Sequence, residues 1–133
     1  SSAHLLKYAA LERIKALSFE GNLLRQTGSL EAAHASLTTA AEVIESHFLT
    51  QDRAATNAAL TTWALPMATL MERRSPDRAV AAYTQIHIWA NCARIFVPDP
   101  AQITDRITQL GGQTNIVITD EICQAPLTLT AFR

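Results

Sequence analysis

The chain has 133 residues, of which 48 % are hydrophobic and 17 % are charged, and its formal net charge is −1. This length suits one domain with a substantial core. The eleven basic residues are dispersed, whereas nucleic-acid binding needs a concentrated basic face, so we expect no nucleic-acid partner. No apolar run approaches the roughly 20 residues that span a bilayer, so we expect no membrane insertion.

A first helix is predicted between Ser2 and Gly28, because apolar and small residues recur there every three or four positions. Ser2 can cap the free amides at its start, and Gly28 can end it in a left-handed backbone conformation. The stripe that should be buried consists of Leu6, Ala10, Ile14, Leu17, Gly21 and Leu24.

A second helix is predicted after Ser29, antiparallel to the first. Its buried stripe is formed by Ala33, Leu37, Ala40 and Ile44. Small residues at a helix crossing let two backbones approach closely, so we expect Gly21 to lie at the crossing. A leucine in place of Gly21 should overpack it.

Two further helices are predicted after a break at residues 50–52. The third covers about residues 53–73, with Leu60, Trp63, Met67 and Leu70 on its buried side. Pro66 lies inside it, which indicates either a bend or two shorter helices. The fourth covers residues 76–93, because a serine, a proline and an aspartate at positions 75–77 form a strong helix start.

Residues 14–46 resemble one tetratricopeptide repeat, since small Gly21, Ala33 and Ala40 alternate with larger Leu17, Leu24 and Leu37. Residues 60–93 resemble a second, divergent repeat. The resemblance implies a helical scaffold that binds a peptide or a partner protein in a concave groove. The residues that it places along this groove are Asn22, Arg25, Asn57 and Thr61.

The composition changes after Arg94. Residues 95–97 are β-prone or form the frayed end of the fourth helix, and a short helix follows Asp99. Residues 115–119 and 127–132 are rich in β-branched or alternating residues, which predicts a pair of strands. The expected fold is therefore mainly α. A helical hairpin domain spans residues 1–94, and a small appendage of one helix and two strands, at 95–133, packs on it or completes a partner's sheet.

Candidate catalytic groups are sparse. Asp120, Glu121 and Cys123 follow a predicted strand, where α/β enzymes often carry reactive groups. Non-catalytic roles are favoured, because the sequence places no base such as His87 beside Cys123. The four histidines lack the three- or four-residue spacing of helical zinc ligands, so no metal or other cofactor is predicted. Cys92 and Cys123 form no CxxC pair, so a disulfide between them stays open, while two free thiols in a cytoplasmic protein are favoured.

The favoured function is a protein–protein interaction module without enzymatic activity. Two hairpins are fewer than a free-standing repeat array needs, so self-association or a larger parent assembly is expected. Two alternatives stay open. The chain could be a fragment or subunit of an enzyme, catalytic or not, whose sheet includes residues 95–132. It could also be a small-molecule sensor that uses the region of Trp63 and Trp89.

Overall fold

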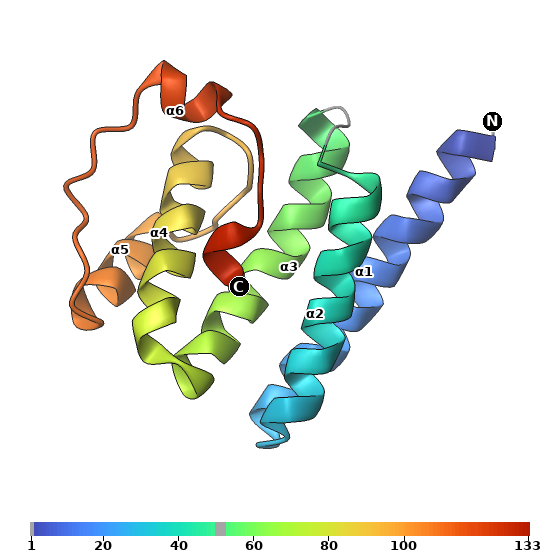
Figure 1. Cartoon of the computed structure of the whole chain (residues 1–133), viewed down its shortest axis with the longest axis horizontal. Helices are drawn as coiled ribbons and strands as arrows, with labels where there is room; N and C mark the ends of the chain where they lie inside the picture. The colour runs from blue at the N-terminus through green and yellow to red at the C-terminus, as the bar shows by residue number, and fades with distance from the viewer. Residues whose placement is uncertain (1, 50–52) are drawn as a thin grey trace.

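The computed structural model describes residues 2–49 and 53–133. These residues form α-helices, one short 3₁₀-helix and irregular connections, arranged as two neighbouring helical hairpins with a C-terminal extension (Figure 1). The elements are α1 (Ser2–Gln26), α2 (Leu30–His47), α3 (Arg53–Arg74), α4 (Pro76–Asn91), α5 (Pro100–Gln109), α6 (Asp120–Gln124) and the 3₁₀-helix η1 (Thr130–Phe132). The predicted break at residues 50–52 lies outside the described residues.

The turn between α1 and α2 forms as predicted around Gly28, whose φ is +85°. The amide of Gly28 donates to the carbonyl of Arg25 at 3.0 Å, and the amide of Ser29 donates to that of Leu24 at 2.8 Å. This pattern is a Schellman motif, which satisfies carbonyls that the helix end leaves open. Ser29 occupies the N-cap position of α2, although its side chain makes no capping hydrogen bond.

The second hairpin, α3 and α4, packs against the first mainly through α3. α3 continues through Pro66 as one helix, so the alternative of two shorter helices is wrong. The buried indole of Trp63 donates from Nε1 to the carbonyl of Leu37 on α2 at 2.8 Å. This bond satisfies both polar groups inside the core and fixes the two hairpins against each other.

α5 packs on α4 and is also tied to α3 by one carboxylate. Glu72 of α3 accepts hydrogen bonds from the hydroxyl of Tyr83 on α4 and from Arg106 on α5. Burial, together with the bond to Glu72, raises the pKa of Tyr83 well above its usual value. The hydrogen bond to Glu72 also raises the pKa of Arg106. α5 is therefore held to both helices of the second hairpin.

The predicted strand pair is wrong: residues 53–133, like residues 2–49, contain no strand. Residues 113–118 have no regular secondary structure, and residues 127–132 end in η1. Figure 1 shows α4 lying between the two segments, with the first on its outer side and the second on the side that faces α2. Since strands must be neighbours to share a hydrogen-bond ladder, this topology excludes the pair. The mainly α part of the prediction is confirmed.

One core extends through both hairpins and into the C-terminal extension. Its largest fully buried side chains are Trp63, Phe48, Ile14, Leu37, Ile44, Leu60, Leu70, Ile86, Ile107 and Leu129. η1 and α5 both contact α4. The domain boundary between residues 1–94 and 95–133 stays a prediction. Residues 95–133 contact residues 1–94 chiefly through α4.

The stripe predicted for α1 is correct in part, since Leu17 and Leu24 are half-buried and the buried Ser18 was not predicted. Ala10, Ile14 and Gly21 are buried, whereas Leu6 is 63 % exposed. α1 has 25 residues and α2 has 18, and both Leu5 and Leu6 in the first turns of α1 are largely exposed. Within residues 2–49 and 53–133, no helix is both long enough and apolar enough to cross a membrane.

Candidate binding groove

The C-terminal segment of the chain, residues 127–133, lies along the groove between α2 and α4, above α3 (Figure 1). Phe132 is 3 % exposed, and its ring centroid is 4.7 Å from that of Trp63 and 5.6 Å from that of Trp89. Leu129 is 1 % exposed. The groove between the hairpins is therefore already occupied by the chain's own C-terminal segment, whose large apolar side chains Leu129 and Phe132 lie in and beside η1.

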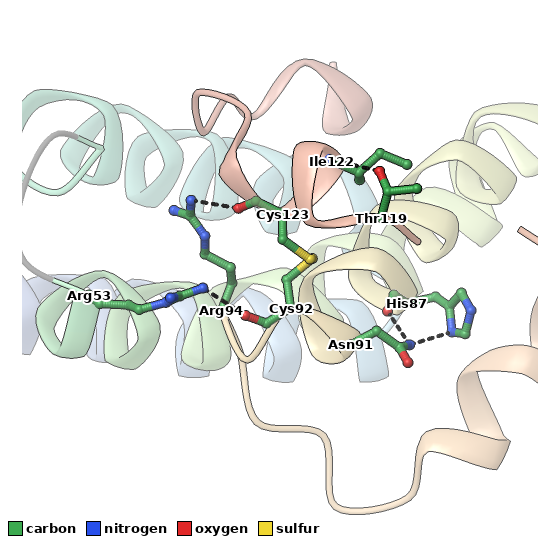
Figure 2. The surroundings of a disulfide bond; sticks show 8 residues. All are labelled: Arg53, His87, Asn91, Cys92, Arg94, Thr119, Ile122 and Cys123. Carbon is green, nitrogen blue, oxygen red and sulfur yellow. Dashed lines mark hydrogen bonds between the residues drawn. A yellow bond between two sulfur atoms is a disulfide. The ribbon is translucent and has the colours of Figure 1, made fainter. Parts of the chain in front are cut away.

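A disulfide between Cys92 and Cys123 holds the start of this segment (Figure 2). Cys92 is the C-cap of α4 and Cys123 belongs to α6, with 5.3 Å between their Cα atoms. Arg94 adds a hydrogen bond from Nη2 to the carbonyl of Cys123 at 3.1 Å. The prediction of free thiols is wrong, because both sulfur atoms are in the disulfide.

The end of α4 is held in a second Schellman motif, in which Ala93 takes the left-handed position with φ of 57°. The amide of Arg94 donates to the carbonyl of Trp89 at 2.8 Å. From α3, Arg53 donates to the carbonyl of Cys92 at 2.8 Å and Asn57 donates to that of Ala93 at 3.4 Å. These bonds satisfy the open end of α4 and position Cys92 for the disulfide.

Beside Phe132 the groove opens into a cavity of about 300 Å³. Its lining is mostly apolar and comes from α2, α3, the start of α4 and the C-terminal segment. The lining residues are His34, Thr38, Ala41, Trp63, Met67, Met71, Arg74, Ser75, Arg78, Leu129, Phe132 and Arg133. Ligand sites often have this combination of an apolar body and a few polar groups, and this volume lies at the small end of their range.

The polar groups of the cavity are predominantly cationic. Arg74 pairs with Glu31 through Nε at 3.0 Å, and Arg133 pairs with Glu45. Arg78 makes no ion pair within the part of the chain that the structure describes. The site therefore offers one guanidinium without a carboxylate partner beside an apolar cavity.

His34 also lines the cavity, near Arg74 and Arg78. Partial burial lowers its pKa, and the positive charges of Arg74 and Arg78 lower it further, against an opposing effect of Glu31. The imidazole is therefore held neutral at pH 7. Its Nε2 lies 3.4 Å from the hydroxyl of Thr38. A neutral ring can accept or donate a hydrogen bond without adding charge to the cavity.

The four groove residues predicted from the tetratricopeptide resemblance form two separate pairs. Asn22 accepts a hydrogen bond from Arg25 at 2.9 Å near the end of α1. Asn57 accepts one from Thr61 at 3.3 Å near the start of α3. The two helices run in the same direction, so the pairs lie at opposite ends (Figure 1). Thr61 also accepts the amide of Phe96 at 3.0 Å, so it holds the connection after α4.

The weak catalytic candidates lie at α6, where Asp120 and Glu121 form the first turn. The hydroxyl of Thr119 caps this helix by accepting the amide of Ile122 at 3.2 Å. Cys123 has no thiol in the disulfide, and thiolate nucleophiles require one. Figure 2 shows His87 directed away from the sulfur atoms. Across residues 2–49 and 53–133 no cluster of three or more histidine, cysteine or acidic side chains could hold a metal.

Sequence reasoning missed His34, Arg74 and Arg78. No motif connects them, because they come from three positions that only the packing of the hairpins brings together. Trp63 was correctly singled out as a side chain that could line a pocket. Trp89 does not line this cavity, and instead stacks on Phe132.

Comparisons with protein-family models, with curated proteins and with solved structures each find no match. The packed helix pairs are compatible with a helical-repeat-like architecture, and membership of the tetratricopeptide family stays a proposal.

Proposed function

We propose that this chain is a helical protein-interaction module that binds a short peptide segment of a partner protein in the groove between α2 and α4. The proposed ligand places an apolar side chain in the cavity beside Phe132 and a carboxylate at Arg78. The observation that carries this proposal is an apolar cavity of about 300 Å³ next to a guanidinium without a carboxylate partner among the described residues. Charge-assisted hydrogen bonds to arginine fix the orientation of such a ligand.

The C-terminal segment supports the same mode of binding. Its buried side chains Leu129 and Phe132 lie at the start and in the last position of η1, so the surfaces of α2, α3 and α4 pack against a short 3₁₀-helical segment. A partner peptide would continue along this surface into the cavity. The lining differs from the one implied by the tetratricopeptide resemblance, which lies on α1 and α3 and stays a separate prediction.

A second candidate uses the same cavity for a small amphipathic anion, such as a medium-chain or aromatic carboxylate. The volume of the cavity supports this candidate, because the cavity fits a small ligand as well as it fits one side chain. The sheet that the enzyme-fragment alternative placed in residues 95–132 is not present, because those residues contain no strand, and a role as an enzyme subunit stays untested. The cytoplasmic prediction also loses its support, since it depended on free thiols and disulfides persist mainly in oxidising compartments.

Binding is tested with an array of short peptides in which an apolar residue is flanked by aspartate or by lysine. The fluorescence of Trp63, recorded in a Trp89→Phe background, reports occupancy because Trp63 lines the cavity. We expect the acidic peptides to bind and the lysine peptides not to bind. Octanoate and phenylacetate serve as probes for the second candidate.

Two substitutions separate the contributions of shape and charge. Ala41→Leu fills the cavity and should abolish binding. Arg78→Glu should weaken the binding of acidic peptides about tenfold or more. Arg73→Glu is the matched control, because Arg73 is exposed, carries the same charge and does not line the cavity. Binding that survives Ala41→Leu, or that responds equally to both arginine variants, contradicts the proposal.

A further inference from the structure

α1 carries a second apolar face, opposite the one that it buries against α2 and α3. On this face Leu5 is 71 % exposed, Tyr8 is 64 %, Phe19 is 68 % and Leu23 is 46 %. α1 is the outermost helix of the two hairpins, and nothing in the described chain covers its outer side (Figure 1). A large apolar face on an amphipathic helix is a common sign of a partner.

The exposed residues follow the spacing of a coiled-coil seam. Along α1 the positions that alternate by three and four residues are Leu5, Tyr8, Glu12, Lys15, Phe19 and Asn22, with Leu23 beside the last. Such alternation keeps one narrow seam facing a second helix over several turns. The seam is apolar at Leu5 and Tyr8, carries two opposite charges at its middle, and ends in Phe19 and Leu23 with the polar Asn22 between them.

The residues of this seam match those of a second copy of α1 that runs in the opposite direction. In an antiparallel pair of α1 helices, Leu5 faces Asn22 and Leu23 of the second copy, and Tyr8 faces Phe19 of the second copy. Glu12 then faces Lys15 of the second copy, and Lys15 faces its Glu12. A two-fold interface requires this property, because each patch must match itself after rotation.

We propose that two copies of this chain associate through α1 in an antiparallel, two-fold symmetric helix pair. Within one chain Lys15 lies 3.3 Å from Glu12, and these two side chains are 50 % and 48 % exposed. In the pair the two copies bring four alternating charges together at the two-fold axis, with aromatic and aliphatic layers on both sides. A parallel pair would instead place like charges opposite each other.

The size of the face is sufficient for a modest dimer. Each copy contributes four large apolar side chains, and aromatic side chains alone carry about 150–250 Å² each. The apolar area removed from water is on the order of 1,000 Å², which lies near the lower limit for specific interfaces. The other described helices of each copy lie on the far side of α1, so they leave this face accessible. This inference is independent of the proposed groove function.

The test is sedimentation equilibrium of the full chain across a range of concentrations. We expect a monomer–dimer equilibrium that Glu12→Lys and Lys15→Glu each weaken about tenfold, because each change places four like charges together. The double variant E12K/K15E should restore the association. An equimolar mixture of the two single variants should associate more tightly than either alone.

The matched control is Glu20→Lys, which makes the same change in charge at an exposed position of α1 outside the seam. It should leave the association unchanged. A chain that stays monomeric at every concentration overturns the proposal. So does a dimer that responds equally to the changes at Glu12 and Glu20, or that the double variant fails to restore.

Discussion

Gly21 and Leu37 meet so closely at the crossing of α1 and α2 that a Cβ atom on Gly21 would lie 2.6 Å from Cγ of Leu37. Leu37 is fully buried, so it has little room to move. Gly21→Ala gains up to about 1 kcal/mol in helix propensity, but overpacking costs about 1–3 kcal/mol. We therefore expect a net loss of stability, measured by urea denaturation.

A double-mutant cycle isolates this contact. Leu37→Ala removes the atoms that obstruct the added Cβ, at its own cost of about 2–5 kcal/mol. In that background Gly21→Ala should become neutral or stabilising. A loss of equal size in both backgrounds would show that the close approach of these two residues is not what makes glycine necessary.

The ring of Phe132 should hold the C-terminal segment in the groove. Phe132→Ala removes a buried aromatic side chain, and such changes typically cost about 3–5 kcal/mol. Detachment of the segment would expose Trp63 and Trp89, and their fluorescence should shift to longer wavelength. Phe96→Ala is the control, because Phe96 is 67 % exposed and its loss should change stability by less than about 0.5 kcal/mol.

The disulfide should stabilise the fold by restricting the unfolded chain. It closes a loop with a sequence separation of 31, for which the chain-entropy model gives about 3–4 kcal/mol. Cys123→Ser should lower the thermal midpoint and increase hydrogen exchange in residues 120–133. A reducing agent should lower the midpoint of the original protein and leave that of the variant unchanged. Two reactive thiols in the denatured, unreduced protein would contradict the cross-link.

Local signals gave the helices reliably because they act within a few residues. Gly28, Ser75 and Asp99 all lie at helix boundaries, although neither Ser75 nor Asp99 makes a side-chain capping hydrogen bond. Residues 115–119 show where local signals fail. Their composition favours a strand, but a strand also needs a neighbouring strand, and α4 separates them from residues 127–132.

The candidate groove could hardly be predicted from the sequence, because contacts between distant residues form almost all of it. Cys92 and Cys123 are far apart in sequence, and only the path of the chain over the end of α4 brings them together. The packing of Phe132 between two tryptophans likewise follows from that path. Sequence periodicity could identify Trp63 as a large buried residue. It could not place Arg78 and His34 beside it, because they belong to different helices.

The pKa of His34 should make stability and ligand binding depend on pH. The folded-state pKa lies below the ordinary value of 6.5, because of burial and the charges of Arg74 and Arg78. Between these two pKa values the unfolded state binds more protons than the folded state. The contribution of neutral His34 to the free energy of unfolding is therefore complete above about pH 6.5. It is lost as the pH falls through the folded-state pKa. Urea denaturation of the original protein and of His34→Gln between pH 5 and 8 measures this contribution, because the other histidines are the same in both proteins.

An anion in the cavity should oppose these charges and raise the pKa of His34 toward its ordinary value. NMR titration of the imidazole with and without a bound acidic peptide measures this change directly. By linkage, the same peptide should bind more tightly as the pH falls through the pKa of His34. An unchanged His34 pKa in the presence of a saturating peptide would place the carboxylate elsewhere, even if the peptide binds.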